Sequence, residues 1–297
     1  MSENLKLESL TGAKQTMSAW TKVIESYEDV PSVYKFFFEE RLADNQTIPY
    51  TLLAPSLVKP AGRTTEKLIC DADNAIHILE RNDSQVVTKS YPYKTISMLE
   101  MGNVLLSSWL TISGVASTGT ADILTIDFND SGIHYYETFI KKLRPLPRET
   151  SMNQFKFEKE KFNYLLTLNF KLMNYARASL IDGEPVQQII LQPAIKKPHY
   201  PILRNRFQKM ITPPHIAVLT SHELIFIEDI GRGRSVEKPQ YGGIWQYIPL
   251  RSIKSMEWSE TEEDWLTLSV TVSPDKTVKK IFAISSKPEL DQLCARF

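Results

Sequence analysis

The chain has 297 residues, 42% of them hydrophobic and 24% charged, which is typical of a folded protein long enough for two domains. Its 35 basic and 35 acidic side chains balance, so any attraction to nucleic acid or to an anionic membrane must be local. The two cysteines, Cys70 and Cys294, are too few and too widely separated to predict a disulfide framework or a cysteine-based zinc site.

Residues 1–29 are expected to be an N-terminal extension. They begin MSENLKLESLTGAK, which lacks the apolar core of a secretory signal. No run of about 18 apolar residues, the length that crosses a bilayer, occurs in the chain. The sequence predicts a cytoplasmic protein, either free or peripheral at the membrane.

The first half of the chain predicts a short helix, seven strands and a closing helix. Apolar residues at helical spacing begin at Val33, and Asp44-Asn45 is expected to end that helix. Strands are predicted over 48–53, 66–70, 75–81, 85–89, 93–101, 104–113 and 121–128. The closing helix has one apolar stripe, formed by Ile133, Tyr136, Ile140 and Leu143.

A boundary is predicted at RPLPRETS, residues 144–151, because two prolines and several polar residues are typical of a linker. The expected domains are therefore 30–146 and 147–297.

The second half predicts the same series. One long helix is expected over 157–181, ended by Asp182-Gly183. Strands are predicted over 186–192, 215–220, 222–228, 244–248, 250–258, 265–272 and 277–284, and in the sixth of them Leu266, Leu268, Val270 and Val272 share one face. The closing helix is expected to bury Leu290, Leu293 and Phe297 and to begin with a capping box formed by Ser286 and Glu289.

The two series indicate a tandem repeat. WLTIS (109–113) matches WLTLS (265–269), and RLADN (41–45) matches SLIDG (179–183). Pro55 and Pro193, like Lys59 and Lys197, lie 138 positions apart. The order of the matches never breaks, so coincidence is rejected in favour of duplication.

Seven strands closed by an amphipathic helix resemble the pleckstrin-homology-like (PH-like) superfamily, especially its bacterial and GRAM-type members. The resemblance is carried by VLTSHELIFI (218–227) followed by YIPLRSIKSMEW (247–258), and in the first half by YPYKTISMLE (91–100). It implies an α+β, mainly β fold of two tandem seven-stranded barrels, each preceded by a helix and closed by a C-terminal helix. It also implies a binding module without catalytic activity.

The strongest local charge lies in KKPHYPILRNRFQKM, residues 196–210. Five basic side chains occur there without an acidic one, and they are candidate ligands for a phosphate group: Lys196, Lys197, Arg204, Arg206 and Lys209. Lys197, Arg204 and Arg206 also fit the loose phosphoinositide signature of PH domains. The alternatives are a solvated loop or a protein contact.

Trp109 and Trp265 occupy equivalent strand starts. They are candidates for an inter-domain or partner interface, where large flat side chains contribute most. The alternative is that each Trp plugs one end of its barrel.

No known catalytic motif is found, and the five histidines lack metal-ligand spacing, so we expect no cofactor, no metal site and no catalytic residue. The sequence predicts a binding or scaffolding protein that recognises a protein partner or an anionic lipid headgroup, and no nucleic acid. Two alternatives stay open: an enzyme with its active site between the domains, and a self-assembling structural protein. The oligomeric state is not predicted.

Overall fold

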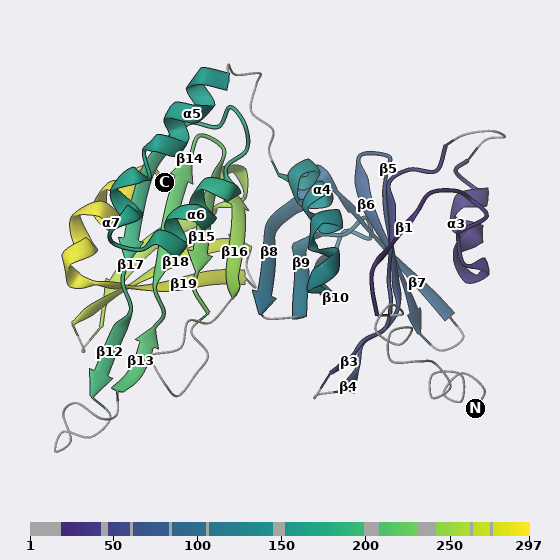
Figure 1. Cartoon of the computed structure of the whole chain (residues 1–297), viewed down its shortest axis with the longest axis horizontal. Coiled ribbons are helices and arrows are strands. Elements are labelled where there is room, and N and C mark those ends of the chain that lie inside the picture. Colours follow the sequence, from purple (N-terminus) through teal and green to yellow (C-terminus); the bar gives the residue numbers. More distant parts are fainter. Residues whose placement is uncertain are drawn as a thin grey trace. The chain divides into compact units, whose positions relative to one another are not determined.

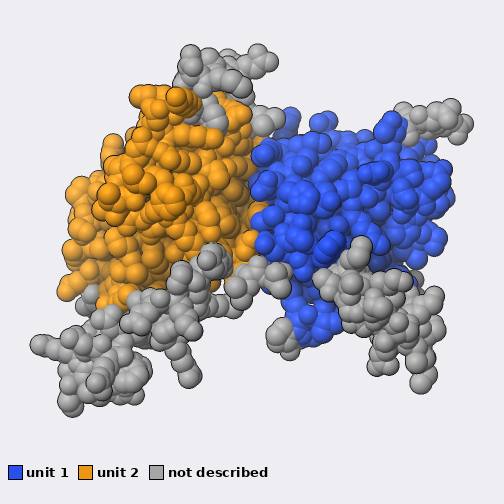
Figure 2. All heavy atoms as spheres, viewed as in Figure 1, with its two compact units in different colours: residues 1–96, 105–143 blue, residues 97–104, 144–297 orange. Residues whose placement is uncertain are grey.

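The computed structural model describes residues 19–42, 47–59, 62–82, 85–104, 107–144, 152–198, 208–230, 242–261, 264–273 and 276–297. They form a mainly β structure with short helices (Figure 1). The chain divides into two compact units, and the first comprises residues 1–96 and 105–143 (Figure 2). The second comprises residues 97–104 and 144–297.

The first unit contains an antiparallel sheet in the order β1 (Lys22–Ile24), β2 (Thr51–Ala54), β5 (Lys67–Ala72), β6 (Ala75–Asn82) and β7 (Gln85–Pro92). Two hairpins accompany it: β3 (Val58–Lys59) with β4 (Gly62–Arg63), and β9 (Ser107–Val115) with β10 (Ala121–Asn129). The predicted N-terminal extension thus contributes β1, which pairs with β2.

The helices of the first unit are short. The predicted leading helix forms η1 (Ser32–Tyr34) and α3 (Lys35–Glu39), which bury Tyr34, Phe37 and Phe38 in a core with Leu68 and Leu79. The 3-10 turn η2 (Tyr93–Thr95) follows β7, and η3 (Asp130–Gly132) leads into α4 (Ile133–Leu143). The residues Asp44-Asn45, predicted to end the leading helix, lie outside the described residues.

The second unit contains one sheet whose strands follow the order β8 (Ile96–Val104), β16 (Gly242–Pro249), β15 (Glu223–Glu228), β14 (His215–Thr220) and β11 (Val186–Gln192). A second, three-stranded sheet consists of β17 (Ser255–Glu260), β18 (Trp265–Ser273) and β19 (Lys276–Ala283). The hairpin β12 (Ile195–Pro198) and β13 (Gln208–Thr212) interrupts the connection from β11 to β14.

The helices of the second unit are α5 (Met152–Glu160), η4 (Asn163–Leu166), α6 (Phe170–Ser179), η5 (Leu250–Ser252), η6 (Ile284–Ser286) and α7 (Lys287–Cys294). The first sheet lies between two layers (Figure 1). One face, with Leu219 and Phe226, shares a core with β18 and α7, while α6 packs on β14 and β15. As predicted, Leu266, Leu268, Val270 and Val272 of β18 face this core.

Strand β8 departs from the predicted architecture. It comes from the first half of the chain, yet it pairs with β16 through Leu99↔Tyr247 and Met101↔Trp245 and places Met98 in the core of the second unit. Gly242 begins β16 with φ +139°, and a Cβ there would collide with the carbonyl oxygen of Asn103. Among the described strands no sheet closes into a barrel, so the two seven-stranded barrels are not confirmed.

Several local predictions were wrong. The helix predicted over 157–181 is broken into α5, η4 and α6. The strands predicted to begin at 93 and 250 begin instead after the 3-10 turns η2 and η5. Ser286 precedes α7 without a side-chain cap, and Phe297 is 47% exposed because α7 ends at Cys294.

The two 3-10 turns η2 and η5 follow the same backbone course. Pro92 (φ −56°, ψ 137°) precedes η2, and Pro249 (φ −56°, ψ 133°) precedes η5. Ile96 (φ −72°, ψ 119°) and Ile253 (φ −73°, ψ 119°) follow them. The proline ring fixes φ in both Pro92 and Pro249. The sequence therefore encodes the same backbone course at both turns.

Candidate functional site

The predicted basic loop forms, in its described part, the β12–β13 hairpin. Lys196 and Lys197 lie in β12, and both side chains are exposed. Lys209 lies in β13 at the position paired with Lys197. The backbone register therefore places two lysine positions opposite each other in the hairpin.

The other two candidate ligands, Arg204 and Arg206, lie outside the described residues. The β12–β13 hairpin lies in the connection between β11 and β14. Lys196 and Lys197 are consecutive residues of its first strand, so their side chains leave opposite faces of that strand.

Trp265 begins β18 as predicted, whereas Trp109 is the third residue of β9, and both tryptophans are partly buried. Trp109 is paired with Asp127 across β9 and β10, and Trp265 is paired with Ala283 across β18 and β19. The Nζ of Lys197 lies 6.0 Å from the centre of the Trp265 ring. One candidate interface residue is thus close to one candidate anion ligand. An interface role for either tryptophan remains a prediction.

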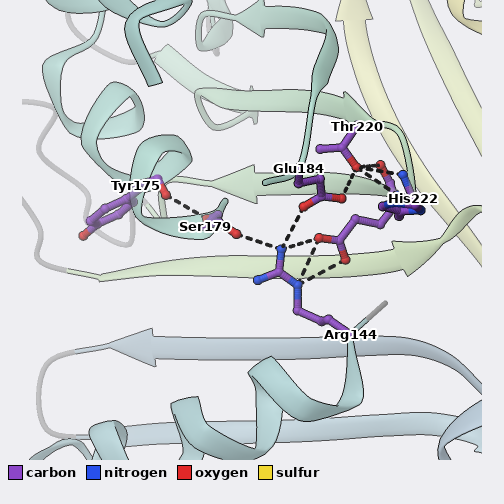
Figure 3. A network of polar contacts seen from close by, with 7 residues as sticks. Arg144, Tyr175, Ser179, Glu184, Thr220 and His222 are labelled. Atoms are coloured by element: carbon purple, nitrogen blue, oxygen red, sulfur yellow. Dashed lines mark hydrogen bonds and ion pairs between the residues drawn. The ribbon is translucent and has the colours of Figure 1, made fainter. Parts of the chain in front are cut away.

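A buried polar network in the second unit was not predicted (Figure 3). Its centre is Arg144, the residue after α4, whose side chain is 5% exposed. The Nε of Arg144 donates to both carboxylate oxygens of Glu223, at 3.0 and 3.1 Å, and its Nη2 donates to Glu223 and to the carbonyl oxygen of Ser179, the latter at 2.7 Å. The guanidinium also lies 4.0 Å from the centre of the Tyr247 ring. The composition of residues 144–151 indicated a solvated linker, so no sequence signal marked Arg144 as buried.

A second carboxylate, Glu184, completes the network and is fully buried. One of its oxygens accepts from the Thr220 hydroxyl. The other, Oε2, lies 4.0 Å from Nη2 of Arg144 and has no hydrogen-bond partner among the described residues. Two buried carboxylates thus share one guanidinium.

The turn between β14 and β15 positions this network. Thr220 ends β14, and its Oγ1 accepts from the backbone amides of His222 at 3.3 Å and Glu223 at 3.0 Å. Its hydroxyl can donate to the carbonyl oxygen of Glu223, 3.0 Å away, or to Glu184, but it has only one proton. The turn thus places the Glu223 carboxylate against Arg144.

The electrostatics of the network follow from burial. Burial, and then the neighbouring Glu223 carboxylate, raise the pKa of Glu184 to about 7, although the Thr220 hydroxyl and Arg144 act against this rise. Burial disfavours the charge on Arg144, but Glu223 more than offsets it, so the pKa of Arg144 lies above its ordinary value. Because neither carboxylate reaches the surface, the network can hold a proton and stabilise the fold but cannot contact a substrate.

A third feature is an exposed apolar segment around η4. Five large side chains between residues 157 and 170 are each 51–64% exposed: Phe157, Tyr164, Leu166, Leu168 and Phe170. The single helix predicted over 157–181 would have buried one stripe of these residues. Asn169, a preferred N-cap residue within the apolar pattern, was the signal against a continuous helix.

In the part of the chain that the structure describes, no group of three or more His, Cys, Asp or Glu side chains could hold a metal ion. None of the described helices is both long and apolar enough to span a bilayer. Cys70 is buried, which raises the pKa of its thiol to about 11, so the thiol is unreactive at neutral pH.

Comparison with known proteins does not assign this chain to a family. No protein-family model matches this chain, and no curated protein matches it either.

Proposed function

We propose that this chain is a non-catalytic binding protein made of two divergent PH-like units, and that it holds a phosphate-bearing ligand at the β12–β13 hairpin. The ligand's phosphate belongs either to a lipid headgroup at a membrane surface or to a protein partner.

The order of elements along the chain supports the PH-like part of the proposal. In the second half, β11, β14, β15 and β16 follow one another and pair antiparallel, then β17, β18 and β19 do the same, and α7 closes the series. In the first half the same series runs through β2, β5, β6 and β7, then β8, β9 and β10, and ends in α4. Each half also carries a small hairpin after its first strand in this series. We propose in addition that each series of strands closes into a barrel.

The observation that carries the ligand assignment is the pair of exposed lysines on β12. Lys196 and Lys197 are adjacent in the chain, and Lys209 occupies the cross-strand partner position of Lys197. Arg204 and Arg206 belong to the same connection in the sequence. Such a concentration of donors favours a multiply charged anion, to which each lysine contributes as a point charge.

The test uses the full chain and vesicles with or without anionic phospholipid, over a salt series. Lys196→Ala/Lys197→Ala should weaken binding to anionic vesicles about thirtyfold at low salt, because each lysine near such a surface contributes about 1 kcal/mol. Lys94→Ala/Lys254→Ala removes the same charge from two other exposed positions and should change binding little.

A soluble polyphosphate tests whether the hairpin recognises phosphate itself. If tripolyphosphate binds and displaces the protein from vesicles, the hairpin recognises phosphate itself and the lipid headgroup is one source of it. Binding to vesicles that ignores lipid charge, salt and the hairpin lysines would reject the assignment.

A further inference from the structure

The apolar side chains around η4 are held in exposed positions by buried neighbours in the same stretch. Phe162, Leu165 and Leu172 of the same stretch are fully buried, so the backbone is anchored to the unit while its neighbours point outward. The amide nitrogen of Asn169 donates to the carbonyl oxygen of Leu165 at 2.8 Å, and the side chain of Asn169 accepts from the amide of Leu172 at 3.0 Å. A segment held in this way presents its apolar side chains at little entropic cost on binding.

Polar contacts fix the two ends of this segment. Glu158 is buried and accepts from the amide of Val186 at 2.7 Å, while Lys161 donates to the carbonyl oxygen of the same residue at 2.8 Å. Arg177 donates to the carbonyl oxygen of Lys159 at 3.1 Å. The α5–η4–α6 stretch is therefore joined to β11 and to itself on both sides of the exposed residues.

Monomeric proteins rarely leave so many large apolar side chains exposed within one short stretch. We define the apolar docking surface as Phe157, Tyr164, Leu166, Leu168 and Phe170. Each leaves more than half of its surface open. Tyr164, Leu166 and Leu168 lie in the connection between α5 and α6, Phe157 lies in α5, and Phe170 begins α6.

The charges around the apolar docking surface are mostly positive. Residues 156–177 contain five basic side chains, Lys156, Lys159, Lys161, Lys171 and Arg177, against two acidic ones, Glu158 and Glu160. Glu158 is buried in its ion pair with Lys161, and Lys171 is paired with Asp229 at 2.6 Å. The remaining basic side chains of the stretch are Lys156, Lys159 and Arg177, against the exposed acidic side chain of Glu160. Glu289 of α7 is also near, since burial and then Glu289 raise the pKa of Tyr164. The excess of positive charge favours an anionic partner.

We propose that the apolar docking surface inserts into the headgroup region of an anionic lipid bilayer. Leu and Phe side chains flanked by lysines are the composition by which a surface segment lies in a membrane interface, with the lysine stems along the apolar region and the ammonium groups among the phosphates. A second copy of the chain fits less well, because a two-fold contact would bring the same lysines against each other.

This inference names a membrane as the partner of the proposed binding function, but it rests on side chains separate from the β12–β13 hairpin. Figure 1 shows α5 and that hairpin at opposite ends of the second unit. A result that rejects the apolar docking surface therefore need not reject the β12–β13 hairpin, and the reverse also holds.

The insertion is tested by an environment-sensitive NBD label on the full chain. Leu168→Cys is labelled in a Cys294→Ser background, since Cys70 is buried and its thiol is unreactive. NBD emission should rise when vesicles of phosphatidylserine and phosphatidylcholine are added. The same label at Ser259→Cys, an exposed position on β17, should not respond.

Removal of the apolar side chains provides the second readout. Leu166→Ser/Leu168→Ser should reduce the partition of the protein onto these vesicles about tenfold or more, without lowering its Tm. Ile123→Ser, which changes a side chain 52% exposed in the first unit, is the matched control and should bind like the wild type.

Each contrary result has a definite meaning. The inference is rejected if the chain ignores anionic vesicles, or if it binds them while the label at position 168 stays unchanged. It is also rejected if light scattering shows an oligomer that Leu166→Ser/Leu168→Ser dissolves, because the surface would then bind a second copy. If Lys196→Ala/Lys197→Ala alone abolishes vesicle binding and Leu166→Ser/Leu168→Ser retains it, the hairpin assignment survives and this inference does not.

Discussion

Arg144 shows what a single residue contributes to the second unit. A buried guanidinium loses its hydration, and this loss is compensated only because Glu223 binds it through both carboxylate oxygens and Ser179 supplies a carbonyl oxygen. Glu184 then adds a second buried negative charge that Arg144 cannot neutralise at the same time. The network is electrically balanced when Glu184 is protonated.

Glu184→Gln should therefore alter the pH dependence of stability. The folded-state pKa of Glu184, about 7, lies above its ordinary value of 4.5, so the native state binds this proton more tightly than the unfolded state does. The resulting stability is complete below pH 4.5 and is lost as the pH rises through 7. Glutamine cannot ionise, so the variant should be more stable than the wild type at pH 8 by up to about 3 kcal/mol.

Urea denaturation of both proteins between pH 5 and 8 checks this expectation. Burial lowers the pKa of His215 to about 4, and the stability due to its neutral form is lost as the pH falls below 6.5 in both proteins alike. The difference between the two pH profiles therefore isolates Glu184. Parallel profiles would show that Glu184 stays ionised in the folded state.

Sequence alone located many residues correctly. The alternation of Leu266, Leu268, Val270 and Val272 predicted a buried face, and all four are buried. Ser286 was wrong as a side-chain cap, because short-range spacing does not determine whether a serine hydroxyl turns toward the helix.

Among the elements, the strands followed their sequence pattern and the long helix did not. The turn between β14 and β15 uses the Thr220 hydroxyl, whereas its counterpart between β5 and β6 uses Asp73 (φ +54°) and Asn74 (φ +56°). Those two residues tolerate left-handed backbone and form a tight hairpin turn. Two different local solutions thus give the same pair of strands.

The predicted helix over 157–181 is broken because Asn169 starts a new one. Its side chain accepts from the amide of Leu172 and so caps α6, whose Leu172, Met173 and Ala176 are buried. A polar cap in the middle of an apolar pattern competes with helix continuation, and the packing of α6 on β14 and β15 decides the outcome.

Asn169→Ala should consequently destabilise the second unit by about 1 kcal/mol, the usual contribution of an N-cap. Asn174→Ala changes the same residue type at an exposed position within α6 and should be neutral or slightly stabilising, because alanine is the better helix former. Urea denaturation measures both variants. Equal stability of the two would mean that the cap contributes nothing.

At the scale of the whole molecule, the second unit takes strand β8 and Arg144 from the region where the first domain was predicted. We expect the fragment 147–297 to be poorly folded, since β16 would lose one of its two partner strands and Glu184 and Glu223 would lose their cation. Leaving a buried charge unpaired typically costs about 3–5 kcal/mol.

Circular dichroism and gel filtration of this fragment test the expectation, with the fragment 144–297 as the control. The control restores Arg144 without β8, so it should recover only part of the stability. A fragment 147–297 that is monomeric and melts as the full chain does would show that β8 and Arg144 are dispensable.

The sequence by itself determined the mainly β class, the repeated order of elements and most strand positions, because periodicity and turn residues act over a few neighbours. Only the tertiary structure decided that β8 pairs with β16, that Arg144 is buried with two carboxylates and that the apolar side chains around η4 remain exposed. Those outcomes depend on which segments distant in sequence meet and on the burial that follows, and local spacing does not encode either.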